Sequence, residues 1–304
     1  MPPSAIARVP ASTANLGPGF DCLGLALGLY NTVNLTVAGT TEVSVFGEGI
    51  GALPLNQKNL VLRAARRLAE WAGVRVPGWR LQQDNEIPLA RGLGSSSAAI
   101  VGGLVAANEL LRAEATPQDL LDLATELEGH PDNVAPALFG GLTVCARDDA
   151  GVHCIAFPPP AGLEVCVGIP ATQISTEEAR AALPDSYSRE DTVHALSHAS
   201  LTLAALVAGR YEVLRAAMRD RIHEPYRLAL VSRLAEGIEA AENAGAQAAV
   251  LSGSGPSIAA FCTELDSKVE DAMLDAFGRI GLRAECRWLV PARGALDPDW
   301  TMSV

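Results

Sequence analysis

The residues best suited to chemistry are the glycines and serines of one short segment, which precedes a long apolar helical pattern. The segment comprises Pro88, Leu89, Ala90, Arg91, Gly92, Leu93, Gly94, Ser95, Ser96, Ser97 and Ala98. Glycine permits positive φ and a close approach of the backbone to a ligand. The N–H groups at the start of a helix attract anions, and serine hydroxyls can bind phosphate oxygens or a metal ion. We therefore predict a phosphate-binding loop; the alternative is a Gly-Ser turn that caps an ordinary helix.

Better-known motifs do not describe this segment. No lysine follows the glycines, which excludes a Walker A loop, and serine replaces the third glycine of a dinucleotide-binding fingerprint. Clustered serines would also suit a serine hydrolase, but the G-x-S-x-G elbow of such enzymes is absent from the sequence. Phosphate binding remains the better explanation of the serines.

Two further polar segments are rich in glycine. Residues 9–21 read VPASTANLGPGFD, and residues 251–257 read LSGSGPS between two expected strands. Together with residues 88–98 they resemble, in the same order, the three signature segments of the GHMP kinases, which phosphorylate small molecules. In that family the middle segment wraps the phosphates of ATP, and the other two line the opposite side of the cleft. The resemblance covers nearly the whole chain.

Within the family, the NLGPGFD run and residues 130–136, HPDNVAP, resemble the branch that phosphorylates L-homoserine. Relatives such as mevalonate kinase place a lysine in the first segment, where this chain has Ser12 or a neighbour. The only lysines of the sequence, Lys58 and Lys268, lie in none of the motifs. A lysine-assisted mechanism is therefore not expected.

The resemblance implies roles for individual residues. It places Asp132 and Asn133 at the catalytic position, Asp132 as a candidate base and Asn133 near the nucleophilic hydroxyl. Two arginines would clamp the substrate carboxylate, a task suited to the guanidinium fork. The implied substrate-binding residues are Asn15, Asp21, His130, Thr176, Arg180 and Arg227. The alternatives are that the arginines are solvated helix residues and that the histidine is a structural cap.

The resemblance also implies Mg²⁺, with ATP as co-substrate, held between the phosphates by Ser96 and Glu126. Hard cations prefer such oxygen ligands. The alternative is that Glu126 lies on a solvated helix face, and Glu128 follows only two residues later. Because phosphoryl transfer has a loose transition state, catalysis is expected to depend mainly on alignment and on neutralising phosphate charge.

Length and pattern predict an α+β protein of two domains. The chain has 304 residues, of which 49% are hydrophobic, and three consecutive prolines at 158–160 mark the boundary. We predict an ATP-binding domain at 1–158 and a second domain at 159–304. The resemblance implies a fold like ribosomal protein S5 domain 2 for the first and a ferredoxin-like fold for the second.

Hydrophobic periodicity predicts the elements that position these motifs. Strands are expected at 5–9, 33–37, 42–46, 79–83, 142–146, 163–169, 248–251, 257–261 and 283–289. Helices are expected at 59–72, from the glycine-serine segment to 111, and at 116–129, 176–182, 190–208, 210–219, 229–244 and 267–279. A serine is expected to cap the second helix, and Thr116 with Pro117 to open the third.

Composition limits the partners. The net charge of −12 argues against a nucleic-acid partner. The six cysteines form no C-x-x-C pair, and no apolar run is long enough to span a membrane. We expect a cytoplasmic protein that binds ATP and L-homoserine, with a homodimer as one option for its assembly. Competing hypotheses are a family kinase for another alcohol and a non-catalytic ligand sensor; Ser96, Glu126 and Asp132 favour an enzyme.

Overall fold

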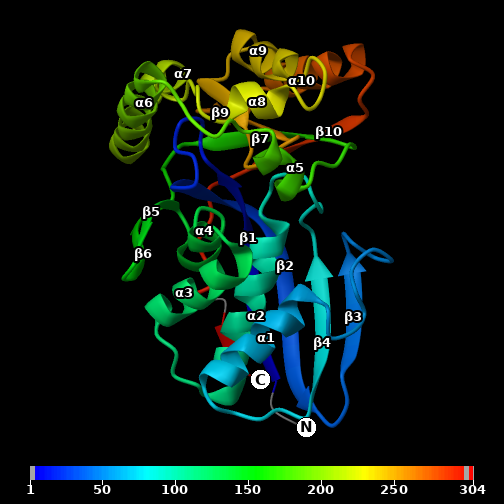
Figure 1. Ribbon diagram of the computed structural model, residues 1–304. Coiled ribbons are helices and arrows are strands. Elements are labelled where there is room, and N and C mark those ends of the chain that lie inside the picture. The colour runs from blue at the N-terminus through cyan, green and yellow to red at the C-terminus, as the bar shows by residue number, and fades with distance from the viewer. Residues whose placement is uncertain (1–3, 298–300, 304) are drawn as a thin grey trace.

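The computed structural model describes residues 4–297 and 301–303. Within these ranges the chain forms two β-sheets, each with its own helices, which lie one above the other in Figure 1. The larger sheet has the path β11-β1-β2-β4-β3 and is extended by β5 and β6 through β2. The smaller sheet has the order β10-β7-β9-β8.

Helices cover one face of the larger sheet (Figure 1). The strands of this sheet are β1 (Ser4–Ala14), β2 (Leu23–Ala38), β3 (Glu42–Gly47), β4 (Gly78–Asn85), β5 (Leu142–Asp148), β6 (Gly151–Phe157) and β11 (Thr301–Ser303). The helices are α1 (Leu60–Trp71), α2 (Ser95–Leu111), α3 (Pro117–Glu128) and α4 (Val134–Phe139). Helix α2 is apolar around most of its circumference, and such a helix is stable only when it is buried on several sides.

Two adjacent glycines allow α2 to pack closely on two sides. A Cβ at Gly102 would lie 2.8 Å from a side-chain carbon of Val33 in β2, and one at Gly103 would lie 2.3 Å from the carbonyl oxygen of Val61 in α1. Neither backbone could approach its neighbour so closely with a side chain between them. The glycine-serine segment at the start of α2 is thereby held at one end of a tightly packed helix.

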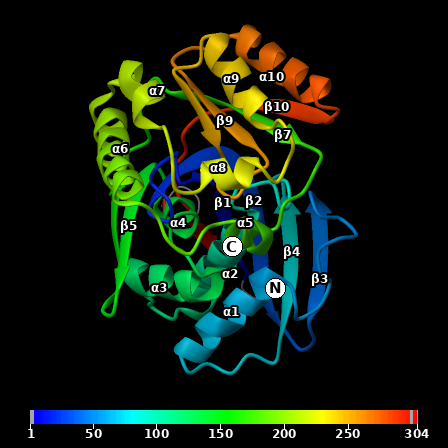
Figure 2. The same ribbon diagram turned by 45° about the horizontal axis from the view of Figure 1, so that its top comes forward.

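The smaller sheet is antiparallel and consists of β7 (Glu164–Pro170), β8 (Ala248–Leu251), β9 (Ile258–Cys262) and β10 (Ala284–Leu289). Numbered along the chain, its strands have the order 4-1-3-2, which confirms the predicted ferredoxin-like arrangement. The outer face is covered by α9 (Ala235–Asn243) and α10 (Ser267–Arg279), which lie above the sheet in Figure 2. The inner face joins the main hydrophobic core.

The connection from β7 to β8 is helical. It contains α5 (Thr176–Ala181), α6 (Arg189–Ala208), the short 3₁₀ turn η1 (Tyr211–Val213), α7 (Leu214–Ala217) and α8 (Glu224–Leu228). The sequence pattern predicts a helix at 229–244, but residues 229–234 form a turn and the helix in this range, α9, begins only at Ala235. Arg233 in that turn has a φ of 63°, which a continuous helix cannot contain.

Four elements were not predicted: α4, α8, β6 and β11. With the last of these, the chain returns to the larger sheet after β10. The backbone N–H of Ala292 donates to the carbonyl of Ala26 in β2, and β11 pairs with β1. The predicted second domain, 159–304, therefore ends in a segment that packs on the first.

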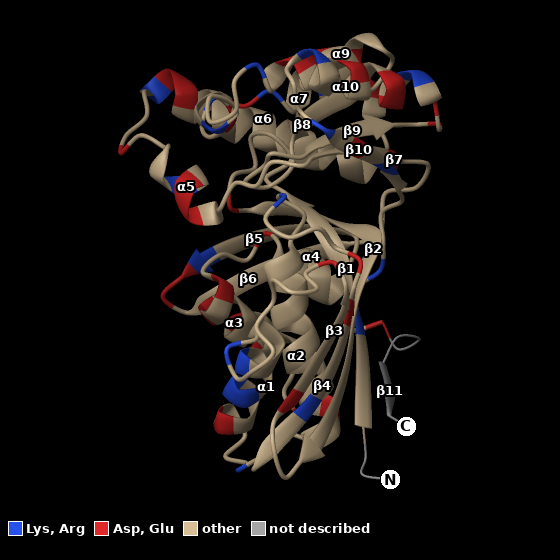
Figure 3. Cartoon of the chain, turned by 90° about the vertical axis from the view of Figure 1, so that its right-hand side faces the viewer, with Lys and Arg blue, Asp and Glu red and all other residues tan. Residues whose placement is uncertain are grey.

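Charged residues of both signs are distributed over the outer helices and the exposed strands (Figure 3). None of the helices in the described part of the chain combines the length and the apolar character needed to cross a membrane.

Candidate active site

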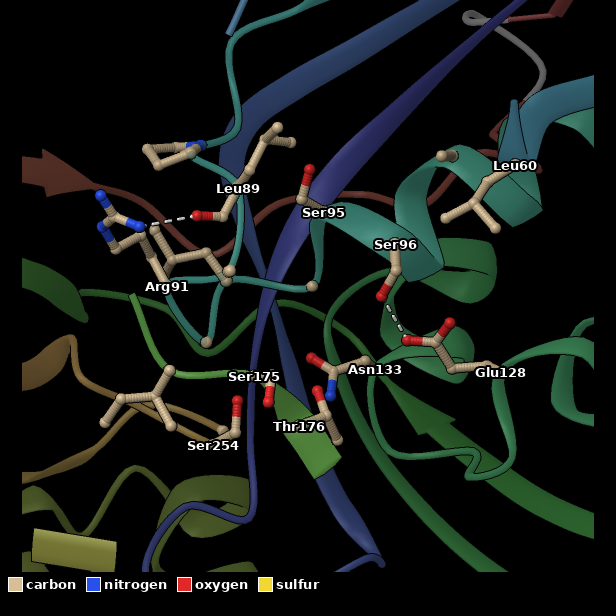
Figure 4. Close-up of a pocket in the computed structure, with 18 of the residues that line it drawn as sticks. Leu60, Leu89, Arg91, Ser95, Ser96, Glu128, Asn133, Ser175, Thr176 and Ser254 are labelled. Carbon is tan, nitrogen blue, oxygen red and sulfur yellow. Dashed lines mark hydrogen bonds between the residues drawn. The ribbon is translucent and has the colours of Figure 1, made fainter. Parts of the chain in front are cut away.

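A cleft of about 420 Å³ opens where the loops of the two sheets meet. It is lined by parts of all three glycine-rich segments, by residues around 128–133 and by the loop before α5. Every predicted site residue lines it except Ser97, Ala98 and Glu126. Ser97 and Ala98 are buried on the inner side of α2. The fold thus brings residues more than 200 positions apart into one site, part of which is shown in Figure 4.

The middle segment has the geometry of an anion-binding loop. Gly92 and Gly94 have φ values of 73° and 68°, in the left-handed region that favours glycine. Gly94 is the N-cap of α2 and provides no side chain to cap it. The serine cap expected from the sequence is thus wrong: the serines lie inside the helix. The first N–H groups of α2 receive no capping side-chain oxygen, and Ser95 and Ser96 of this first turn line the cleft.

Hydrogen bonds lock the three segments together. The backbone N–H of Ser12 donates to the carbonyl of Leu93 at 3.1 Å. The Ser252 hydroxyl lies 2.7 Å from the carbonyl of Gly92 and 2.9 Å from the Thr13 hydroxyl. The first and third segments therefore hold the middle one in place.

Arg91, predicted to contact ATP, has its guanidinium engaged elsewhere. Its Nε and Nη2 donate to the carbonyls of Pro170 and Ala171 at 2.7 and 2.5 Å, and its Nη1 donates to the carbonyl of Leu89 at 2.9 Å. Figure 4 shows the last of these bonds. Burial lowers the pKa of Arg91. The Arg91 side chain therefore connects the loop to the end of β7 through hydrogen bonds.

The carboxylate beside the loop serines is that of Glu128. One of its oxygens accepts hydrogen bonds from Ser96 and Ser97 at 2.6 and 2.7 Å. Figure 4 shows the bond from Ser96. Glu126 instead forms an exposed ion pair with Arg67 at 2.9 Å and does not line the cleft. The predicted pairing of Ser96 with Glu126 is corrected accordingly. Two positions along a helix turn a side chain by roughly 200°, so only one of the two glutamates can face the serines.

Asp132 and His130 form a tight pair at the floor of the cleft. The Nδ1 of His130 lies 2.5 Å from Oδ1 of Asp132. Burial lowers the pKa of His130, but the hydrogen bond and the charge of Asp132 outweigh it and the pKa is raised. Ligand atoms of Asp21, His130 and Asp132 all lie within 4.8 Å of one another. Neighbouring Asn133 accepts a hydrogen bond from the Ser12 hydroxyl at 2.8 Å.

The first segment positions Asp21 toward Arg180. Asn15 and Asp21 both have positive φ, 70° and 57°. Asn15 accepts the backbone N–H of Asp21 and donates to the carbonyl of Gly253, both at 3.0 Å. The carboxylate of Asp21 accepts hydrogen bonds from both terminal nitrogens of Arg180, at 2.8 and 3.0 Å. This hydrogen bond is the main cause that raises the pKa of Arg180.

Arg227 is almost completely buried, with 3% of its surface exposed. Its Nη1 donates to the carbonyl of Gly253 at 3.0 Å, and its Nε lies 3.4 Å from the carbonyl of Ala179. Burial, followed by repulsion from Arg180, lowers its pKa. Among the residues that the structure describes, no carboxylate lies at ion-pair distance from its guanidinium. A buried cation without a counter-ion is costly unless a ligand supplies one.

Some cleft residues were not identified from the sequence. Lys58 lines the cleft with Leu53, Asn59 and Leu60, although the sequence places it in no motif. Phe20 of the first segment does not line the cleft but lies under the guanidiniums of Arg180 and Arg227, and the sequence pattern assigns it no role. No local signal marks Lys58, because only the return of the chain before α1 brings it to the site. An aromatic residue next to Asp21 could have been identified from its position in the segment.

Comparison with known proteins identifies the class. The family model of the GHMP kinase N-terminal domain matches residues 59–141, and that of the GHMP kinase C-terminal domain matches residues 202–279. The chain belongs to the GHMP kinase family. Its two-domain fold and its family are therefore as predicted, and the enzyme class is that of kinases which transfer phosphate to a hydroxyl group.

Several similar proteins belong to one branch of the family. The chain is 44% identical to a homoserine kinase from Moorella thermoacetica, covering 94% of this chain and 97% of that protein. It is 49% identical to a homoserine kinase from Deinococcus radiodurans, covering 84% and 83%. A crystal structure of homoserine kinase from Cytophaga hutchinsonii superposes with a TM-score of 0.87 and 29% identity, covering 99% and 97%.

Proposed function

We propose that the chain is a homoserine kinase, which transfers the γ-phosphoryl group of ATP to the hydroxyl of L-homoserine and releases ADP and O-phospho-L-homoserine, a step toward threonine. The names of its relatives support this activity. The observation that carries it is the buried guanidinium of Arg227, which lacks a carboxylate partner among the described residues and lies in the same cleft as a phosphate-type loop.

The substrate end of the cleft has groups that match an amino acid. Arg227 and Arg180 can receive a carboxylate, while Asp21, Asp132 and the amide of Asn15 supply acceptors for an ammonium group. Thr176, the first residue of α5, also lines the cleft (Figure 4) and adds a hydroxyl to it. A neutral sugar alcohol would leave Arg227 without a counter-ion. The site therefore favours an amino-acid alcohol.

The phosphate end has a donor set suited to Mg²⁺. The hydroxyls of Ser96 and Ser97 and the carboxylate of Glu128 converge within hydrogen-bond distance, and hard cations prefer such oxygens. We propose that Ser96 and Glu128 hold the ion; Glu126 points elsewhere. When bound, Mg²⁺ neutralises negative charge on the phosphates.

The residues of this chain then act mainly by alignment. The N-terminal turn of α2 receives the phosphates, and the buried loop contacts prevent the loop from shifting. Asp132 can accept a hydrogen bond from the substrate hydroxyl through the oxygen that His130 does not use, which orients that hydroxyl. Because the transition state is loose, a strong base is not required, and the proton can pass to Asp132 or to the phosphate.

The test is a panel of small alcohols assayed for Mg·ATP-dependent release of ADP. We expect rapid turnover with L-homoserine and little with mevalonate or galactose. Preferred turnover of one of the latter would make the chain a different kinase of the family. Binding of homoserine without release of ADP would make it a ligand sensor.

A further inference from the structure

A buried histidine stands directly behind the arginine that lacks a counter-ion. The imidazole of His223, at the N-terminus of α8, is completely buried. Its Nε2 lies 2.8 Å from the carbonyl oxygen of Gly17, and its Nδ1 lies 3.4 Å from Nη1 of Arg227. A carbonyl oxygen can only accept, so Nε2 carries the proton and Nδ1 presents its lone pair to the guanidinium. One ring therefore links the first segment to the arginine.

The same ring rests on an aromatic side chain that both arginines share. Phe20 stacks on His223 with ring centroids 5.3 Å apart and an angle of 25° between the planes. The guanidinium carbons of Arg227 and Arg180 lie 5.1 and 5.7 Å from the centre of the Phe20 ring. Cations within about 6 Å of an aromatic face are attracted to it. Phe20 thus lies beneath two like charges that otherwise repel each other.

The position of His223 is itself fixed. One oxygen of Asp220 accepts the backbone N–H groups of His223 and Glu224, each at 2.7 Å, and the other accepts that of Ile222 at 2.9 Å. A Cβ at Gly17 would lie 2.2 Å from the carbonyl oxygen of Met218, so the first segment and the turn before α8 are in direct contact. The ring cannot move without displacing one of these two segments.

We propose that His223, supported by Phe20, is a positioning residue that sets the separation and orientation of the two guanidiniums and thereby selects substrates with a carboxylate. The inference rests on the proposed function and deepens it. His223 does not line the cleft, so it acts on the substrate only through Arg227 and Gly17. Its contribution is geometric: two guanidiniums bind one carboxylate well only at a fixed spacing.

The electrostatic environment of the ring agrees with this role. Burial lowers the pKa of His223; Asp220 opposes the shift, Arg227 adds to it, and Gly17 and Asp21 oppose it. The ring is therefore neutral near pH 7. A protonated ring would present a hydrogen-bond donor to Arg227 and would remove the contact that orients it.

The test compares three variants in steady-state kinetics with homoserine, with ATP and with 3-aminopropan-1-ol, which lacks the carboxylate. In His223→Leu we expect KM for homoserine to rise at least tenfold while KM for ATP stays within about twofold. His223→Gln keeps a donor for Gly17 and should recover part of the loss. Phe20→Leu leaves the contact with Gly17 intact and should show a smaller rise. The preference for homoserine over 3-aminopropan-1-ol should fall most in His223→Leu and less in His223→Gln and Phe20→Leu.

The control is His153→Leu, which replaces an exposed histidine of β6 and should change none of these values. A common rise of both KM values in His223→Leu and Phe20→Leu, or an unchanged preference for homoserine, would overturn the proposal. So would failure of the glutamine variant to recover any activity while its melting temperature matches wild type. If the wild type did not phosphorylate homoserine at all, the proposed function itself would be wrong and this inference with it.

Discussion

The hydroxyl of Ser12 donates a hydrogen bond of 2.8 Å to the side-chain oxygen of Asn133, 121 positions away in the chain. The bond joins the first glycine-rich segment to the proposed catalytic segment directly beside the phosphate loop. A Cβ at Gly94 would lie 2.2 Å from the Ser12 hydroxyl and 3.1 Å from the Asn133 oxygen. The first glycine-rich segment, the middle one and residues 130–136 therefore meet at Gly94, and the absence of a side chain there is a requirement of the site.

Gly94→Val should remove ATP binding. The substitution forces a β-branched residue to a φ of 68° and pushes its Cβ into Ser12 and Asn133. Calorimetric titration with ATP should show an affinity loss of at least about tenfold, in a protein whose circular dichroism matches wild type. Gly73 offers a matched control, because it has the same φ of 68° with no atom within 4 Å of a built Cβ. Unchanged affinity in Gly94→Val would refute the loop assignment.

Glu128→Gln should weaken the binding of Mg²⁺, whereas Glu126→Gln should not. Only Glu128 lies beside Ser96 and Ser97, and removing its charge takes away the one carboxylate proposed to hold the ion. We expect the Mg²⁺ concentration for half-maximal activity to rise at least about tenfold in Glu128→Gln. Loss of the exposed pair between Glu126 and Arg67 costs at most about 1 kcal/mol of stability. The opposite ranking of the two variants would return the metal role to Glu126.

Motifs that act locally could be predicted from the sequence. Gly92 and Gly94 have positive φ, a local backbone conformation that the choice of glycine already indicates. Helix α10 begins and ends at the residues that its hydrophobic periodicity predicts. Thr116 caps α3 with a complete capping box, as its spacing from Asp119 requires. In each case neighbouring residues in the chain are sufficient to determine the structure.

Properties that depend on distant contacts could not be predicted. The choice between Glu126 and Glu128 depends on which side of α3 faces α2, and both residues lie in the same helical turn. Arg91 lies inside the glycine-serine segment, yet its guanidinium donates a hydrogen bond to the carbonyl of Pro170 at the end of β7. The strand β11 is only three residues long, too short for its periodicity to be read. Each of these outcomes is decided by tertiary packing.

Glu224 should make the protein less stable as the pH rises. Burial raises the pKa of this carboxyl from 4.5 to about 8, although it accepts the backbone N–H of Leu251. Between those pH values the folded state keeps a proton that the unfolded state has lost, so stability falls from about pH 4.5 to pH 8. A pKa that differs by one between the folded and unfolded states changes the free energy of unfolding by about 1.4 kcal/mol.

Urea unfolding at several pH values measures this dependence. Glu224→Gln keeps a carbonyl acceptor for Leu251 but cannot ionise, so the fall in stability toward alkaline pH should become shallower. The exposed Glu212→Gln should leave the slope unchanged. Equal slopes in wild type and Glu224→Gln would show that this carboxyl does not carry the dependence.

Arg227→Leu tests the carboxylate clamp directly. If the substrate carboxylate is the missing counter-ion of this buried guanidinium, its removal leaves the anion uncompensated, which costs on the order of 2–5 kcal/mol. That corresponds to a loss in kcat/KM for homoserine of roughly 30-fold to several thousand-fold. ATP affinity should barely change, because the proposed clamp faces the amino acid and not the nucleotide. Arg80→Leu, at an exposed position of β4, is the control for loss of an arginine.

The decisive comparison uses 3-aminopropan-1-ol, which keeps the hydroxyl and the ammonium group of homoserine but has no carboxylate. This substrate should be poor for the wild type and should lose little further activity in Arg227→Leu, because the contact removed is one that it never makes. Arg227→Lys keeps the charge without the planar fork, so its kcat/KM for homoserine should lie between those of wild type and Arg227→Leu. If Arg227→Leu discriminated against the analogue as strongly as wild type does, Arg227 would not contact the carboxylate, and its buried charge would have to serve the packing of α8 against the third segment.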